Sequence, residues 1–250
     1  MQIIGVDIGN SAIKIGVPNS GDEFNRICIA DVDEQFHGEL PSQPCFWSVC
    51  SVSQSKAETL KLWIEKHRPA DRYYLLQADD VPLNSNVVNR QQVGRDRLVA
   101  AWMANQLCSI ESGLVVIDAG TAVTIDLVDS AACFQGGVIF PGIGTNLKTL
   151  ARATHDLPDL ETGTAQVKQI MEDVIGKDTE MAILRGVFRS QLAAYEKISH
   201  DISATSPIIA TGGVIELMKE FLPTHWHFEP LLVVRGAYEI GKTIHKKTDE

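Results

Sequence analysis

The chain of 250 residues lacks three features that mark membrane and secreted proteins. No apolar run approaches the roughly 18 residues that a membrane-spanning helix requires. The N-terminus has no basic segment followed by an apolar stretch, so no signal peptide is expected. The five cysteines form no C-x-x-C pair and have no regular spacing, which is typical of reduced thiols rather than of a disulfide framework. We therefore expect a cytoplasmic protein with no membrane partner.

Basic residues are also in short supply. The 22 Lys and Arg residues stand against 32 Asp and Glu, and the net charge is −10. Such a balance does not favour binding to nucleic acid, and any anionic substrate must be met by local positive groups or metal ions. Apolar residues make up 44% of the chain, a composition typical of a globular protein with a substantial core.

The first residues predict a strand, a tight turn and a second strand. Apolar residues 3–6 lead to Asp7, the segment Gly9-Asn10-Ser11 tolerates the backbone angles of a turn, and a second apolar strand starts at Ala12. A carboxylate at a strand end, beside backbone N–H groups, suits a phosphate and its cation. A hairpin that contains an acidic residue can equally be no more than a hairpin.

The same pattern returns in the second half of the chain. Apolar residues 114–117 lead to Asp118-Ala119-Gly120-Thr121, and a second strand follows, 111 residues after the first copy. An internal repeat indicates two related halves, and two facing Asp-x-Gly turns can hold the two ends of a triphosphate. We expect an α/β protein with an N-terminal lobe of residues 1–112, a C-terminal lobe of residues 113–250 and a cleft between them.

Three further segments carry candidate functional residues. Gly94-Arg95-Asp96-Arg97 precedes a helical pattern, so its polar groups lie at a positively polarised helix N-terminus; the alternative is a helix-start acid with a solvated arginine pair. A long amphipathic helix starts at Asp178 or Thr179, either of which is a plausible N-cap. Thr211-Gly212-Gly213 separates a strand from a helix and lets a ligand approach the backbone. A last strand is predicted at residues 231–234, before a final helix.

These motifs resemble, in order and over nearly the whole chain, those of type III pantothenate kinases, a family of the acetate and sugar kinase/actin superfamily. The matching segments are D7-I-G-N-S-A-I-K, G94-R-D-R, D118-A-G-T-A-V-T-I-D, G136-G-V-I-F-P-G, T154-H-D-L-P, G176-K-D-T and T211-G-G. The resemblance implies two ribonuclease-H-like lobes with ATP in the cleft between them, a homodimer, and phosphorylation of pantothenate to 4'-phosphopantothenate, the first step of coenzyme A biosynthesis.

The resemblance also implies residue roles. Asp96 would be the general base, Asp118 would bind a monovalent cation such as K⁺ or NH₄⁺, and Asp7 would lie near Mg²⁺. The residues implied at ATP are Asp7, Ile8, Gly9, Asn10, Ser11, Ala12, Ile13, Lys14, Thr121, Gly212 and Gly213. Those implied at pantothenate are Gly94, Arg95, Asp96, Arg97 and Thr179, the last reaching across the dimer interface.

Three positions differ from the family pattern. Many members have a Tyr where this chain has Val87, a Pro where it has Arg90, and an Asn where it has Asp178. These differences concern the substrate pocket and leave the phosphoryl-transfer residues unchanged. Two alternatives stay open: a kinase or phosphohydrolase of the same superfamily that acts on another alcohol or on polyphosphate, and a non-enzymatic regulator similar to the Bvg accessory factor.

Overall fold

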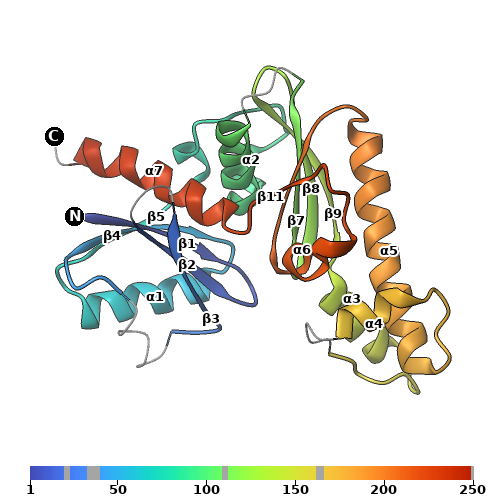
Figure 1. Cartoon of the computed structure of the whole chain (residues 1–250). Helices are drawn as coiled ribbons and strands as arrows, with labels where there is room; N and C mark the ends of the chain where they lie inside the picture. The colour runs from blue at the N-terminus through green and yellow to red at the C-terminus, as the bar shows by residue number, and fades with distance from the viewer. Residues whose placement is uncertain (20–22, 33–39, 109–111, 162–165, 249–250) are drawn as a thin grey trace. The chain divides into compact units, whose positions relative to one another are not determined.

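The computed structural model describes residues 1–19, 23–32, 40–108, 112–161 and 166–248 (Figure 1). The chain forms two compact units: Met1–Ser109 with Leu231–Glu250, and Ile110–Pro230. Both units are mixed α/β, as predicted. The chain crosses to the second unit close to the expected position, but residues 231–250 belong to the first unit and not to the C-terminal lobe in which we expected them.

The sheet of the first unit has the strand order β3-β2-β1-β4-β5. These strands are β1 (Gln2–Ile8), β2 (Ile13–Pro18), β3 (Phe24–Ile29), β4 (Cys45–Ser51) and β5 (Arg72–Leu75). The central strand β1 pairs antiparallel with β2 and parallel with β4. All of β1 is buried except Gln2 and Asp7, which are partly exposed, and this explains its nearly continuous apolar sequence.

Helices cover both faces of this sheet (Figure 1). Helix α1 (Gln54–His67) packs on one face through the apolar stripe that its sequence predicts. The spacing of Ser55 and Glu58 is that of a capping box, but the helix begins at Gln54 and its N-cap, Ser53, makes no side-chain cap hydrogen bond. Helix α2 (Arg95–Leu107) packs on α7 (Leu232–Thr248), which lies against β1 and β4.

Residues 231–234 are not the strand that we predicted. Residues from Leu232 onward belong to α7, and Val233 and Val234 are buried. A short apolar run fits a buried strand and a buried helix equally well, so periodicity alone could not distinguish them. The close approach of α7 depends on Gly5 in β1, where a Cβ atom would lie 2.2 Å from the carbonyl oxygen of Val234.

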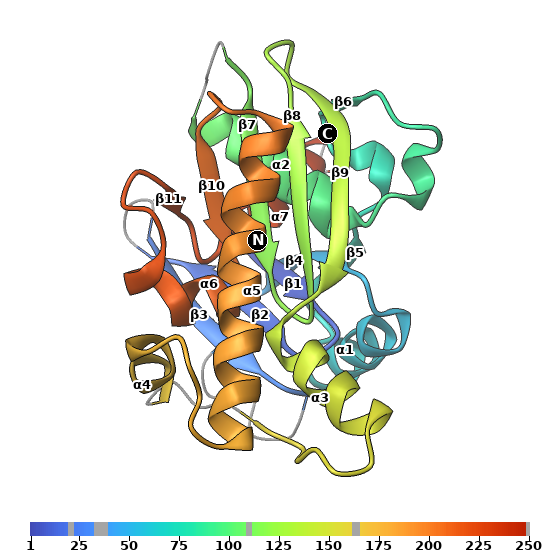
Figure 2. The ribbon, with the colours of Figure 1, turned by 90° about the vertical axis from the view of Figure 1, so that its right-hand side faces the viewer.

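The strands of the second unit form a sheet in the order β11-β10-β7-β8-β9. They are β7 (Leu114–Ala119), β8 (Ala122–Val128), β9 (Cys133–Pro141), β10 (Ile208–Thr211) and β11 (His227–Phe228). Strands β7, β8 and β9 pair antiparallel in succession, whereas β10 is parallel to β7. The long helix α5 (Thr179–Ile202) crosses one face of this sheet (Figure 2), and its Tyr195 lies in the core with Val123 and Ile125.

Shorter elements complete the two units. The second unit adds α3 (Ile143–Ala153), α4 (Val167–Glu172), α6 (Gly213–Met218) and the 3₁₀ turn η5 (Lys219–Phe221). Between β5 and α2 the chain forms η2 (Ala78–Asp80), β6 (Asn84–Ser85) and η3 (Arg90–Gln92). The six-residue helix α4 was not predicted. Among the described helices, none has the length and apolar character needed to cross a bilayer.

Candidate functional site

The first Asp-x-Gly turn joins β1 to β2 in the first unit. Asp7 and Lys14 face each other across this antiparallel pair, with Asp7 Oδ2 3.6 Å from Lys14 Nζ. Their side chains are 14% and 22% exposed. The turn closes through a 3.0 Å hydrogen bond from Gly9 N–H to the Ala12 carbonyl. A carboxylate and an ammonium group therefore lie together at the turn end of the hairpin.

The other residues of this turn divide into two groups. Asn10 and Ser11 are exposed at its tip, where their polar groups can meet a ligand. Ile8 and Ile13 are 0% and 1% exposed and belong to the core of the first unit. Only the backbone atoms of these two isoleucines can contribute to an ATP site, whereas their side chains hold the hairpin in place.

The segment Gly94-Arg95-Asp96-Arg97 forms the start of α2. Gly94 is the N-cap and Asp96 lies in the first turn, where its Oδ1 accepts a 2.8 Å hydrogen bond from the Arg97 backbone N–H. A Cβ atom at residue 94 would lie 2.5 Å from this Oδ1, so glycine leaves room for the carboxylate. The structure thus gives Asp96 the fixed orientation of a helix-start acid, and this is compatible with a second role for it as a base.

Burial and charge act together on Asp7. Burial raises the pKa of this carboxyl group from 3.8 to about 6, the nearby Lys14 ammonium opposes the rise, and the negative charge of Asp96 adds to it. The two carboxylates are therefore close enough to interact electrostatically. A carboxyl group with a pKa raised in this way is more frequent at functional sites than elsewhere, and Asp7 lies close to residues predicted at both ATP and pantothenate.

Arg95 differs from the solvated side chain of the alternative hypothesis. Its guanidinium donates to the Ser51 carbonyl at 3.2 Å and to Gln77 Oε1 at 3.3 Å. These contacts link the N-terminus of α2 to the end of β4 and to the segment that follows β5. The side chain that we predicted at pantothenate thus has partners in the protein itself.

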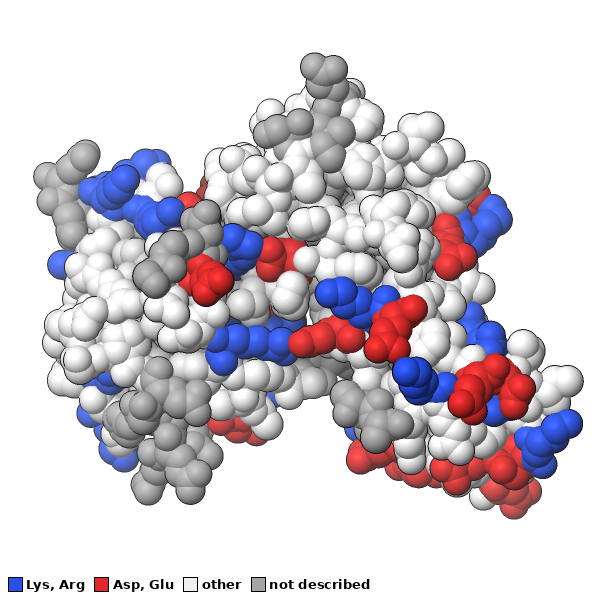
Figure 3. Space-filling model, viewed as in Figure 1, with Lys and Arg blue, Asp and Glu red and all other residues white. Residues whose placement is uncertain are grey.

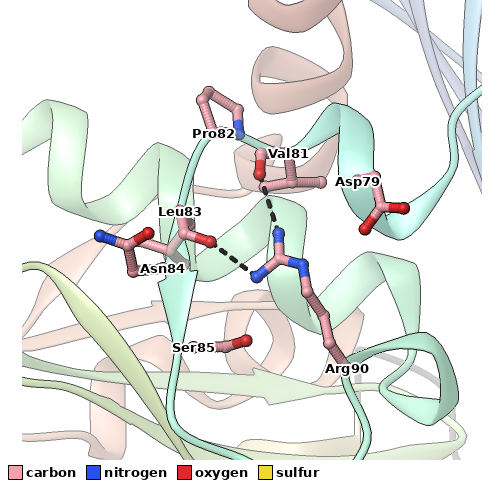
Figure 4. Close-up of a pocket in the computed structure, with 7 residues that line it drawn as sticks. All are labelled: Asp79, Val81, Pro82, Leu83, Asn84, Ser85 and Arg90. Carbon is pink, nitrogen blue, oxygen red and sulfur yellow. Dashed lines mark hydrogen bonds between the residues drawn. The ribbon is translucent and has the colours of Figure 1, made fainter.

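Arg90, which replaces the usual Pro of the family, organises the preceding loop. Its guanidinium donates to the carbonyls of Leu83 at 2.6 Å, Val81 at 2.8 Å and Ala78 at 2.9 Å. Figure 4 shows this side chain at the wall of a pocket of about 410 Å³. Buried carbonyl groups need hydrogen-bond donors. Arg90 donates to three carbonyls of its own loop, which is a structural role that the sequence alone did not reveal.

The second Asp-x-Gly turn joins β7 to β8 in the second unit and is one residue shorter. It closes through a 3.0 Å hydrogen bond from Gly120 N–H to the Ala122 carbonyl, and Asp118 faces Thr124 across the strand pair. An ungapped comparison of the two halves pairs Lys14 with Ile125, and this pairing is wrong. The structural counterpart of Lys14 is Thr124, because each lies opposite the aspartate of its own hairpin.

Thr121 lies exposed at this second turn, above a Pro-Gly turn. Its carbonyl accepts hydrogen bonds from Gly142 N–H at 3.0 Å and from Thr145 Oγ1 at 2.6 Å. A Cβ atom at Gly142 would lie 2.0 Å from the Gly120 carbonyl oxygen. The Gly-Gly-x-Ile-x-Pro-Gly motif thus ends in a glycine because the two turns are in direct contact.

The predicted segment Thr211-Gly212-Gly213 lies beside the second Asp-x-Gly turn. It follows Thr211, which pairs with Asp118 in the sheet, and it has φ +100°. A Cβ atom here would lie 2.4 Å from the Ala119 carbonyl oxygen. Gly213 is exposed and opens α6. The structure therefore brings Asp118, Gly212 and the turn at Thr121 together.

Thr179 lies elsewhere in the second unit. It is the exposed first residue of α5, and Asp178 is confirmed as the N-cap through a 2.8 Å hydrogen bond from Met181 N–H. The residue of α5 that contacts the Pro-Gly turn is Gln191, which the helical rise places roughly 18 Å further along the helix. Thr179 is thus not brought to Asp118 and Thr121 within its own unit.

Two polar side chains behind the Pro-Gly turn of the second unit were not predicted from the sequence as candidate functional residues. Gln191 donates to the Pro141 carbonyl, and Tyr195 donates to Gln191. A signal was present, since Gln191 lies on the stripe of α5 that Leu184 and Phe188 occupy, and a polar residue at a core position is informative.

Charged side chains of both signs lie interspersed over the face drawn in Figure 3, and acidic side chains gather around α3 and α4 at one end of the second unit. Three basic residues of the first unit, Lys14, Arg95 and Arg97, belong to predicted ligand-binding segments.

Comparison with known proteins agrees with these motifs. The family model described as type III pantothenate kinase matches residues 3–201. A type III pantothenate kinase of Sulfurihydrogenibium sp. (strain YO3AOP1) is 31% identical over 96% of this chain and 100% of the relative. One from Rhodopirellula baltica is 28% identical over 96% of this chain and 98% of the relative.

Solved structures support the fold. A Baf family transcriptional activator from Campylobacter jejuni superposes with a TM-score of 0.62 at 24% identity, covering 98% of this chain and all of that chain. An activator of a 2-hydroxyisocaproyl-CoA dehydratase from Clostridium difficile, with bound ADPNP, gives a TM-score of 0.52 at 14% identity, covering 99% and 98% of the two chains. At these identities the likeness shows a shared fold alone, whereas the sequence match over residues 3–201 shows that the chain belongs to the type III pantothenate kinase family.

Proposed function

We propose that this chain transfers the γ-phosphoryl group of ATP to the primary hydroxyl of pantothenate, forming 4'-phosphopantothenate in the first step of coenzyme A biosynthesis, with Asp96 as the general base. Family membership supports the reaction. The observation that supports the residue assignment is the cluster of Asp7, Lys14 and Asp96 in the first unit. Because the reaction consumes ATP, we expect the protein to work in the cytoplasm.

The chemistry requires positioning, charge neutralisation and removal of one proton. The pantothenate hydroxyl oxygen forms a bond to the γ-phosphorus while the bond from that phosphorus to ADP breaks. The hydroxyl proton passes to the Asp96 carboxylate, whose orientation is fixed by the N–H of Arg97. The Arg97 guanidinium is a suitable partner for the carboxylate of pantothenate.

The first turn suits the phosphates and their Mg²⁺ ion. Mg²⁺ prefers oxygen ligands and is typically bound by one or two carboxylates together with substrate phosphates, so the partly exposed Asp7 carboxylate fits it. Bound there, Mg²⁺ would neutralise phosphate charge. Lys14 would contribute a second positive charge, and the exposed tip of the turn, Asn10-Ser11, would supply polar groups.

The second turn is proposed to meet the other end of ATP, with Thr121 at the phosphates and Gly212-Gly213 near the adenosine. Asp118 is the proposed ligand of K⁺ or NH₄⁺. The distance of Thr179 from this turn along α5 favours its action at the pantothenate site of a partner in a homodimer. A sedimentation measurement that finds only a monomer would contradict that last assignment.

Substitution of Asp96 by Asn tests the proposed reaction. We expect Asp96→Asn to lower kcat by roughly 10² or more, the usual size of a general-base contribution, in an assay of pantothenate-dependent ADP release. Asp129→Asn is the matched control, because Asp129 Oδ1 also accepts backbone N–H groups, from Ala131 and Cys133, and because Asp129 follows β8 at the opposite end of that strand from Thr121. Turnover by Asp96→Asn equal to that of the control would remove the base role.

The rival functions make different predictions in the same assay. A kinase for another alcohol would consume ATP with a sugar and not with pantothenate. A regulator similar to the Bvg accessory factor would consume no ATP with either. Neither rival is favoured by the named relatives, which are type III pantothenate kinases.

A further inference from the structure

Two buried polar side chains connect the long helix α5 to the Pro-Gly turn of the second unit. Gln191 is 4% exposed, and its Nε2 donates to the Pro141 carbonyl at 2.9 Å. Tyr195 is fully buried, and its hydroxyl donates to Gln191 Oε1 at 2.9 Å. The nitrogen and the oxygen of the Gln191 amide are thus both hydrogen-bonded, and these two bonds fix the orientation of the amide.

The same turn supports Thr121. Gly142, next to Pro141, donates its N–H to the Thr121 carbonyl at 3.0 Å. There is no room for the Pro-Gly turn to move closer, since even a Cβ atom at Gly142 would lie 2.0 Å from the Gly120 carbonyl oxygen. A shift of Pro141 is therefore transmitted to the turn at Thr121.

A buried glutamine needs an explanation, because an apolar side chain would fill this core position at a lower desolvation cost. Neighbouring positions on the stripe hold Leu184 and Phe188, so the surroundings suit an apolar residue. The Pro141 carbonyl has a second donor, Asn146 Nδ2 at 3.1 Å, so Gln191 is not required merely to satisfy that carbonyl. What Gln191 adds is a rigid, buried link between α5 and the turn.

We propose that Gln191, oriented by Tyr195, is a positioning residue for phosphoryl transfer: it fixes the Pro141-Gly142 turn and, through it, the Thr121 turn that meets the phosphates of ATP. The proposal rests on the proposed function, because the phosphate contact of Thr121 is part of it. It adds two residues of α5 that touch neither substrate, and it assigns their effect to ATP and not to pantothenate.

The test compares three variants of the full chain. Gln191→Met keeps the side-chain length and removes both hydrogen bonds, and Tyr195→Phe removes only the hydroxyl that orients Gln191. Ser199→Ala is the matched control, because Ser199 is buried on the same helix and its Oγ has no hydrogen-bond partner. Thermal unfolding first identifies a temperature at which all three variants are folded.

We expect Gln191→Met to lower kcat/KM for ATP by about tenfold, a typical consequence of a small misplacement of a reacting group, with KM for pantothenate unchanged. Tyr195→Phe should show the same selective effect at a smaller size, and Ser199→Ala should match the wild type. An unchanged kcat/KM for ATP in folded Gln191→Met, or a raised KM for pantothenate with an unchanged KM for ATP, would overturn the proposal.

A second measurement keeps the two proposals separate. If the wild type does not phosphorylate pantothenate, the proposed function fails, and titration with a fluorescent ADP analogue then tests Gln191 alone. Weaker binding of the analogue by Gln191→Met than by Ser199→Ala supports the positioning role. Equal binding by these two variants refutes it.

Discussion

The raised pKa of Asp7 predicts that this carboxylate lowers the stability of the folded protein at neutral pH. Its pKa is about 6 in the folded chain against the ordinary 3.8, so the folded state binds the proton more tightly than the unfolded state. Stability therefore falls as the pH rises from about 4 to 6, and the deficit persists above pH 6. A shift of this size corresponds to about 3 kcal/mol.

Replacement of Asp7 by Asn should remove this deficit, because the amide stays neutral at every pH. The attraction of Lys14 is already contained in the pKa, since it acts on the ionised carboxyl group. We therefore expect Asp7→Asn to be more stable than the wild type by up to about 3 kcal/mol above pH 7, and equally stable near pH 4. Its kinase activity should be lost, as is common where stability and function compete.

Urea unfolding at pH 5, 6, 7 and 8 measures this difference. Tryptophan fluorescence follows both units, since Trp47 and Trp63 lie in the core of the first unit and Trp226 lies in the core of the second. Asp129→Asn, in the second unit, controls for the amide substitution itself. A variant Asp7→Asn that is less stable than the wild type at pH 8, or a stability difference that is constant from pH 5 to 8, would refute the assigned burial of this charge.

Three other substitutions and one exchange of ions test the geometry. Gly212→Ala should lower stability by more than about 1 kcal/mol, seen as a lower melting temperature, because residue 212 has φ +100° and its Cβ would lie 2.4 Å from the Ala119 carbonyl oxygen; an unchanged melting temperature would contradict this. Arg90→Met should destabilise by about 1–3 kcal/mol in urea unfolding, because it leaves three carbonyls without this donor. Exchange of K⁺ for Na⁺ should lower turnover if Asp118 is a cation ligand, and Thr124→Lys, which places an ammonium group opposite Asp118, should abolish that salt dependence; equal wild-type rates in both salts would count against the site.

The strands were the most predictable part of the fold. Buried strands such as β1 and β7 combine apolar runs with turn residues at their ends, so both local signals agree. The error at residues 231–234 arose because this short apolar run, with Pro230 before it and Gly236 after it, fits a buried strand and a buried helix equally well. The placement of α7 on the first unit depends on contacts with β1, more than 200 residues away, and no local pattern encodes such contacts.

The candidate site shows a similar division. Residue types at strand ends and at a helix start indicated Asp7, Asp96 and Asp118, because the Asp-x-Gly turn occurs twice, 111 residues apart, and because a helix N-terminus suits anionic ligands. The partners of Arg90 and Arg95 were not predictable, since an arginine on a loop looks solvated until the carbonyls that accept its hydrogen bonds are located.

The one-residue difference between the two turns separates the roles of the two units. Each hairpin ends its first strand with an aspartate, and the residue directly opposite is Lys14 in the first unit and Thr124 in the second. Asp7 therefore has a cation supplied by the protein, whereas the residue facing Asp118 brings no charge. The two hairpins therefore differ in the residue that faces the aspartate, an ammonium group in the first unit and a neutral hydroxyl group in the second, and the comparison of K⁺ with Na⁺ tests whether Asp118 binds a monovalent cation.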